Sequence, residues 1–247
     1  MWDDAKQMNA LAITLASIAT IVLLFGVVAY AVRQPAFAFR EVVVTTPLTR
    51  ANGAHLEAVI REELAGTIFT MDLARARAAL EGVPWVRSAA LRRQWPHRLE
   101  VAISEHEPLA RWNEGELVNT RGEVFAADSR DELPQFDGPA GRAADVAARY
   151  AAWSQTLRPL ALTLTRVRLS PRGGWRLDAR GATGPLTLEL GRDEPDARLA
   201  RFVAVHGRTL AALARAGVAV DTVDLRYRNG FAARIPGFRE KSGRRPA

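Results

Sequence analysis

The hydrophobic and polar positions divide the chain into a long apolar run and two segments with mixed periodicity. Residues 11–32 contain no charged side chain and show no polar face. As a helix this run spans about 33 Å, at ~1.5 Å per residue, which matches the ~30 Å hydrocarbon core of a bilayer. The pattern therefore predicts one transmembrane helix. A cleavable signal peptide is the alternative, but the run exceeds the ~7–15 apolar residues of a signal core and no basic start precedes it.

The charges on either side of the apolar run do not settle its orientation. Asp3, Asp4 and Lys6 precede the run, whereas Arg33 and Arg40 follow it. The positive-inside rule thus gives no support for a cytoplasmic N-terminus, although long domains translocate largely regardless of charge. From charge alone, the orientation stays open.

The first mixed segment has the pattern of a small α+β domain. β-Branched and alternating residues predict strands, and an i, i+3, i+4 apolar spacing predicts helices, with Asp72 as a helix N-cap. The predicted elements are a strand at 39–45, helices at 55–64 and 73–80, and strands at 86–95 and 99–104. The order is β-α-α-β-β, and we place this domain at residues 37–112.

The second mixed segment, residues 113–236, predicts a larger sheet with helices. Its expected elements are a hairpin at 117–119 and 124–126, a helix at 143–157, strands at 163–169, 175–179 and 186–190, and one long helix from Pro195 to about Leu213. At its end Val223, Leu225 and Tyr227 alternate with polar residues, and Asn229-Gly230 leads into residues 231–235. Asn-Gly between two such runs is a strong hairpin signal.

Composition narrows the function classes. The 247 residues carry a net charge of +7, nearly all of it from arginine, and contain no cysteine. The arginines are spread along the chain, which does not favour nucleic-acid binding. No nucleophile motif, phosphate-binding loop or metal-ligand spacing is present, so His97 and His106 are expected to be structural and no cofactor or metal is expected. A carboxylate pair for glycan hydrolysis stays open, because acidic residues are numerous.

Several short motifs, in order, resemble the FtsQ/DivIB family of bacterial cell-division proteins. In the first segment they are 66–69 (GTIF) leading into Asp72, 83–86 (VPWV), 93–96 (RQWP), 99–101 (LEV) and 107–112 (EPLARW). In the second segment they are 133–139 (LPQFDGP), 199–203 (LARFV) and 223–230 (VDLRYRNG). Such proteins carry a POTRA domain, the β-α-α-β-β module, immediately outside the membrane.

The resemblance implies an α+β architecture and a cellular location. It implies a short cytoplasmic tail (1–10), a single N-terminal transmembrane helix (11–32), a POTRA domain, a mixed α/β domain with an extended antiparallel sheet, and a basic disordered tail (237–247). The chain would then sit in the bacterial inner membrane at the division septum, with both domains in the periplasm. A POTRA-containing, chaperone-like component of an outer-membrane assembly or secretion system is the alternative, but only one POTRA repeat and no barrel-length series of strands is seen.

The resemblance also implies a scaffold rather than an enzyme. The final strand, at the end of the chain, is expected to be a sheet edge that a second polypeptide extends by β-augmentation. By the resemblance, the partner is FtsB, arriving with FtsL, and FtsK, FtsW and FtsI are further partners; the protein would help to control septal peptidoglycan synthesis. The implied contact residues are Arg172, Arg226, Tyr227, Asn229, Gly230 and Phe231, with Arg172 and Arg226 pairing with acidic partner residues.

Overall fold

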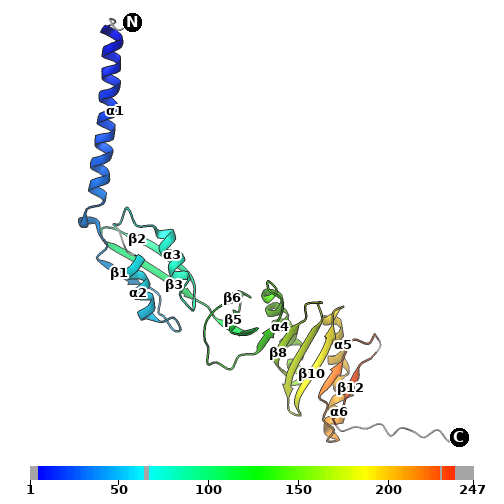
Figure 1. Cartoon of the computed structure of the whole chain (residues 1–247). Coiled ribbons are helices and arrows are strands. Elements are labelled where there is room, and N and C mark those ends of the chain that lie inside the picture. Colours follow the sequence, from blue (N-terminus) through cyan, green and yellow to red (C-terminus); the bar gives the residue numbers. More distant parts are fainter. Residues whose placement is uncertain (1–4, 64–66, 229, 237–247) are drawn as a thin grey trace, which may run out of the picture. The chain divides into compact units, whose positions relative to one another are not determined.

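The computed structural model describes residues 5–63, 67–228 and 230–236, which form two compact units divided between His106 and Glu107 (Figure 1). The predicted disordered tail at 237–247 and the predicted turn residue Asn229 lie outside the described residues.

The first unit begins with the apolar helix α1 (Ala5–Val32), which starts six residues before the predicted span. Its stretch Met8–Val32 is long and apolar enough to cross a membrane, with a mean hydropathy of 2.6. The hydroxyls of Thr14, Ser17 and Thr20 each donate to the carbonyl four residues earlier, at 2.8–2.9 Å. These internal bonds satisfy polar groups that would be costly in a bilayer.

The rest of the first unit is a three-stranded sheet with two helices, in the predicted β-α-α-β-β order. After a 3-10 turn η1 (Pro35–Phe37), its elements are β1 (Glu41–Val44), α2 (Gly53–Glu63), α3 (Leu73–Glu81), β2 (Val86–Gln94) and β3 (Arg98–Glu105). The sheet order is β1-β3-β2, with β1 parallel and β2 antiparallel to β3. Because β3 is central, Leu99, Val101 and Ile103 are buried. The predicted N-cap is confirmed, since Asp72 accepts bonds from the amides of Ala74 and Arg75.

The second unit is built on one nine-stranded mixed sheet. Its strands are β4 (Pro108–Trp112), β5 (Glu116–Asn119), β6 (Val124–Phe125), β7 (Gln135–Asp137), β8 (Thr163–Leu169), β9 (Trp175–Gly181), β10 (Gly184–Gly191), β11 (Thr222–Asp224) and β12 (Ala232–Arg234). The order is β12-β11-β10-β9-β8-β7-β4-β5-β6. The helices are α4 (Ala143–Leu157), α5 (Pro195–His206) and α6 (Leu210–Arg215), and a 3-10 turn η2 (Arg158–Leu160) follows α4.

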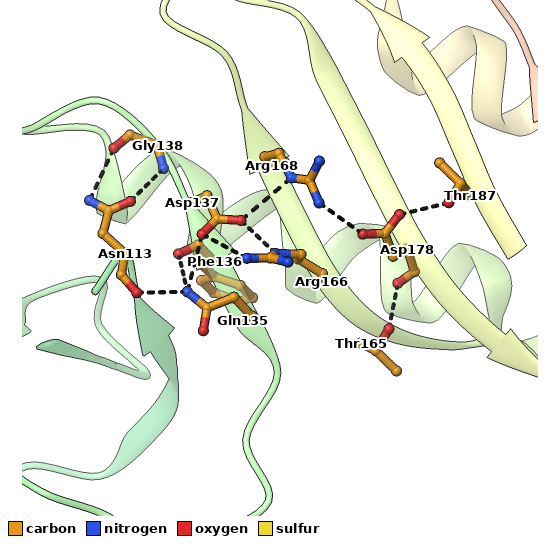
Figure 2. Close-up of polar contacts among 10 residues, drawn as sticks. All are labelled: Asn113, Gln135, Phe136, Asp137, Gly138, Thr165, Arg166, Arg168, Asp178 and Thr187. Atoms are coloured by element: carbon orange, nitrogen blue, oxygen red, sulfur yellow. Dashed lines mark hydrogen bonds and ion pairs between the residues drawn. The ribbon is translucent and has the colours of Figure 1, made fainter. Parts of the chain in front are cut away.

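One face of this sheet packs on the helices and the other is polar. Trp153 of α4, Phe202 of α5 and Leu210 of α6 share one core cluster with the buried strand residues. On the polar face, ion pairs link successive strands (Figure 2). Asp137 of β7 accepts from Arg166 at 2.6 Å and lies 3.5 Å from Arg168, both on β8, and Arg168 reaches Asp178 of β9 at 3.2 Å.

Three sequence predictions need correction. Residues 108–112 were assigned to the first domain, but β4 pairs with β5 and β7, and Ala110 and Trp112 are buried in the second core, so the second unit begins at Glu107. The long helix from Pro195 is divided into α5 and α6, because Thr209 adopts a non-helical conformation (φ −114°, ψ −87°).

The third correction concerns the closing hairpin. The strand predicted through Tyr227 ends at Asp224, and seven residues, 225–231, connect β11 to β12 instead of a two-residue turn. The Asp224 carboxylate accepts the amide of Arg226 at 3.0 Å, an Asx-type bond that turns the backbone out of the strand. Local side-chain chemistry therefore overrides the alternating pattern.

Candidate partner-binding edge

The strand β12 forms one edge of the large sheet, as predicted. In the part of the chain that the structure describes, β12 pairs only with β11, in antiparallel register with Val223 opposite Ala233. All three of its residues are exposed. Figure 1 shows β12, near the C-terminus, at the outer edge of the large sheet. An edge of this kind presents main-chain groups that a further strand can pair with.

The hydrogen bonds of β11 identify which groups of β12 are open. The Leu225 amide donates to the Glu189 carbonyl and the Thr187 amide donates to the Asp221 carbonyl, so in this parallel register the main-chain groups of Val223, which lies between them, face β10. Main-chain direction alternates along a strand, so Thr222 and Asp224 direct their groups toward their β12 partners, Arg234 and Ala232.

The Arg234 carbonyl shows to which side the main-chain groups at the end of β12 point. It accepts the Asp221 amide at 3.2 Å and therefore faces β11. The next residue toward the start of the strand, Ala233, has the opposite direction. It follows that the N–H and C=O of Ala233 point away from β11, toward the open side.

The connection between β11 and β12 is held against helix α5. Leu225 is buried, and the ring of Phe231 packs edge-on to that of Phe202, with 6.3 Å between centroids. Arg201 of α5 donates to the carbonyl of Arg228. An open groove of about 640 Å³ lies between α5 and this connection, lined by Arg198, Arg201, Phe202, Ala204, Val205, Thr209, Leu225, Arg228, Gly230 and Phe231. The groove combines an apolar floor with arginine side chains, a chemistry suited to an apolar peptide with acidic residues.

Arg226 already has an acidic partner within the chain. Its guanidinium forms a two-pronged pair with Asp224, with Nε–Oδ1 at 2.9 Å and Nη2–Oδ2 at 2.7 Å. The hydrogen bond from Arg226 lowers the pKa of Asp224, and the same bond raises the pKa of Arg226. The Arg226 side chain also lies over Gly191, where an added Cβ would come within 3.0 Å of its Cγ. Asp224 thus holds Arg226 in place at the end of β11.

Arg172 lies in the exposed turn between β8 and β9. This turn is at the same end of the sheet as Arg226, because Trp175 at the start of β9 pairs with Gly191, which Arg226 covers. One strand, β10, separates β9 from β11, so these two strands are roughly 10 Å apart, at ~4.8 Å per strand. Arg172 and Arg226 can therefore face the same ligand only if it extends across the end of the sheet.

The predicted contact residues differ in their exposure and in their position on the sheet. Tyr227 is 57% exposed, Gly230 lines the groove, Phe231 is half-buried against α5, and Asn229 lies outside the described residues. Sequence reasoning missed the contributions of Arg201 and Ala233. Arg201 lies on the helix, and nothing in its local pattern pointed to the loop; the open orientation of Ala233 follows only from strand pairing. Among residues 5–63, 67–228 and 230–236, no group of three or more His, Asp or Glu side chains is placed to hold a metal ion.

Comparison with known proteins decides the family. Residues 37–106 match the family model described as "POTRA domain, FtsQ-type", and residues 110–226 match "Cell division protein FtsQ/DivIB, C-terminal". The chain is also 37% identical to the cell division protein FtsQ of Burkholderia pseudomallei over 247 residues, which cover 97% of this chain and 96% of that relative.

The chain belongs to the FtsQ/DivIB family. The FtsQ of Nitrosospira multiformis is 35% identical over 239 residues, covering 95% of this chain and 99% of the relative. The FtsQ of Bordetella pertussis is 35% identical over 253 residues, covering 94% and 92%. Both segments of motifs therefore identified the family correctly, and the POTRA match at 37–106 agrees with a domain that stops before β4. As a member of this family, the chain is a cell-division protein.

Proposed function

We propose that this chain is a non-catalytic scaffold of the division machinery that captures a strand of FtsB along β12. The observation that supports this function is the open edge of β12, where, among the described residues, the main-chain groups of Ala233 have no partner strand on their outer side. A strand of FtsB would supply the missing hydrogen bonds, and its side chains would meet Tyr227 and the groove beside Phe231.

Charge would select the partner and its register. Arg172 at the β8–β9 turn and Arg226 at the end of β11 would pair with acidic residues of FtsB, with Arg226 shared with Asp224. Asn229 and Gly230 would also belong to the contact. FtsL would arrive with FtsB, and FtsK, FtsW and FtsI would be further partners, so that the assembly helps to control septal peptidoglycan synthesis. No cofactor takes part in this function.

The proposed cellular location follows from α1 and from the family. We propose that α1 is retained as a single inner-membrane anchor, with the short N-terminal tail in the cytoplasm and both domains in the periplasm at the division septum. Membership of a cell-division family and one helix long enough to span support this arrangement. The orientation is part of the proposal.

Cysteine crosslinking tests strand capture directly, because the chain has no native cysteine. An Ala232→Cys variant of the full chain would be paired with single cysteines placed one at a time along the periplasmic segment of FtsB. Successive side chains of a strand alternate between faces, so we expect disulfides at every second FtsB position. Thr163→Cys, an exposed site on the interior strand β8, is the matched control and should form none.

The crosslinking pattern also separates the alternatives. A maximum at every third or fourth FtsB position would mean that a helix lies against the edge, and the strand-capture proposal would be wrong. Equal crosslinking at Thr163→Cys would mean that the reaction reports random collision.

A further inference from the structure

The start of the first domain is tied to the end of helix α1. The Thr67 hydroxyl donates to the Val32 carbonyl at 2.7 Å, and Thr67 also forms a β-bridge with Ala38. Next to this bridge the rings of Phe37 and Phe69 meet edge to face, with 5.3 Å between centroids. The loop that contains residues 67–71 therefore lies at the point where the apolar helix ends.

The turn between β2 and β3 lies beside the same segment. The amide of Arg40 donates to the His97 carbonyl at 2.9 Å, only two residues beyond Ala38, or about 7 Å along an extended chain. Arg93 at the end of β2 donates to the Met71 carbonyl at 2.6 Å and so joins this turn to the 67–71 loop. Two loops that are distant in sequence thus flank the residues that leave α1.

Both loops expose a large aromatic side chain. Trp95 is 70% exposed and Phe69 is 50% exposed, in a unit whose other large side chains outside α1 are mostly buried or half-buried among the described residues. Tyr30, in the last turn of α1, is 72% exposed. Tryptophan and tyrosine concentrate at membrane–water interfaces, where the ring is buried and its polar edge stays wet.

Exposed arginines lie on the same segments of the chain as these aromatic residues. Arg33 and Arg40 on the exit segment, and Arg92 near the end of β2, are all exposed. The neighbouring Arg98 is paired with Glu41 at 2.7 Å. Arg33 and Arg40 are also the residues that give the apolar run a basic C-terminal flank, against the usual distribution of charge around an N-terminal anchor. A local ligand with negative charge would account for their position.

We propose that this membrane-proximal end of the first domain, formed by Arg33, Arg40, Phe69, Arg92 and Trp95, binds the lipid surface from which α1 emerges. The proposal rests on α1 being a retained anchor, but not on capture of FtsB. Trp95 and Phe69 enter the boundary between headgroups and acyl chains, and the arginines contact lipid phosphates. The first domain is then held in a fixed orientation against the bilayer rather than hanging from a free tether.

The direct attachment of this surface to the end of α1 favours lipid as its occupant. The 25 residues of Met8–Val32 rise about 37 Å, so the helix is long enough to cross the ~30 Å hydrocarbon core and place Val32 at its boundary. Thr67 is bonded to the last residue of that helix. Phe69 and the β2–β3 turn consequently lie next to the headgroup layer, which is roughly 5–8 Å deep on each side of the bilayer.

Spin labelling of the full chain in lipid vesicles tests the proposal. A nitroxide on Gln94→Cys, the turn label, would report the β2–β3 turn. A nitroxide on Ser104→Cys, the distal label, would report the opposite end of β3, about 20 Å from Arg98 at ~3.3 Å per residue. Both native side chains are exposed, and no other cysteine competes for the nitroxide. The measured quantity is the ratio of collision rates with oxygen, which partitions into lipid, and with a water-soluble nickel chelate.

We expect a higher oxygen-to-nickel ratio for the turn label than for the distal label, and a further rise for the turn label when phosphatidylglycerol is added to phosphatidylcholine vesicles. Adding Trp95→Ser and Phe69→Ser should lower the ratio of the turn label to that of the distal label. Replacing Arg33, Arg40 and Arg92 by glutamine should remove the response to phosphatidylglycerol.

Two results would overturn the proposal. The first is an equal oxygen-to-nickel ratio for the turn label and the distal label in the native background. The second is protection of the turn label from both reagents, which would indicate a protein contact such as a second copy. Neither result depends on FtsB, so the lipid contact and the strand capture can fail separately.

Discussion

Replacing Ala233 by proline tests the strand-capture account at a single main-chain group. Proline has no N–H and adds a ring in its place, and it is tolerated on an edge strand where that N–H faces solvent. The pairing of β11 and β12 places the Ala233 N–H on the open side. Ala233→Pro should therefore leave the sheet of this protein intact and still prevent a partner strand from docking.

The loss of affinity can be estimated from that one group. A hydrogen bond contributes about 0.5–1.5 kcal/mol net, and a carbonyl of the partner left buried without a donor costs about 1–3 kcal/mol more. A total near 3 kcal/mol corresponds to a roughly hundredfold increase in Kd. The proline ring would also occupy space next to the edge and would add to this loss.

Calorimetric titration of the full chain with the periplasmic segment of FtsB measures Kd, and a thermal melt followed by circular dichroism measures stability. Ala232→Pro is the matched control, because the Ala232 N–H faces β11; it should lower the melting temperature, whereas Ala233→Pro should not. Unchanged affinity for FtsB in a folded Ala233→Pro variant would refute the reasoning. A large loss of stability in Ala233→Pro would show that its N–H is bonded within the chain.

Three further results are expected. Tyr227→Ala should weaken FtsB binding by about 2 kcal/mol, or roughly thirtyfold, with little change in melting temperature because the side chain is 57% exposed; full-strength binding would exclude Tyr227 from the contact. Glu105→Gln should destabilise the first domain by about 1–2 kcal/mol, because the carboxylate accepts hydrogen bonds from the amides of residues 49–51. Burial alone would raise the pKa of Glu105, but those bonds and the Thr49 hydroxyl outweigh it and lower the pKa below 4.5. The stabilisation by Glu105 is therefore present above pH 4.5 and lost as pH falls through the lowered value. In denaturant melts, the destabilisation caused by Glu105→Gln should be smaller at pH 4 than at pH 6; equal destabilisation at the two pH values would contradict this assignment. Asp137→Ala should lower stability by about 1 kcal/mol at low salt and by less at high salt, since it removes the acidic partner of Arg166 and one of the two acidic partners of Arg168. A salt-independent effect in urea melts would show that these charges do not matter.

The small first domain could be predicted closely from sequence because its signals are local. Asp72 caps a helix through amides two and three residues away, and the alternation of Leu99, Val101 and Ile103 reflects one face of a central strand. Where β4 belongs could not be predicted, because the partners of Ala110 and Trp112 are strands that come later in the chain. Strand assignment depends on pairing, which a local pattern does not contain.

At the candidate edge, too, some features could be predicted from the local sequence and others depend on contacts between distant residues. That the last strand lies at a sheet edge could be expected from its place in the chain, and this expectation is confirmed. The extent of the hairpin could not, because Asp224 uses its side chain to end β11, and Tyr227, the third apolar residue of the alternating run, is exposed and lies outside the strand. Arg201 reaches the connection from α5, a contact between residues 27 positions apart that no spacing rule contains.

Amide hydrogen exchange at β12 tests the central claim most directly. In the free protein, the Ala233 amide should exchange rapidly, while the neighbouring Ala232 and Arg234 amides, which face β11, should be protected. On addition of the FtsB segment, the Ala233 amide should become protected. An Ala233 amide that is already protected in the free protein, or one whose exchange rate does not change when FtsB binds, would contradict the account.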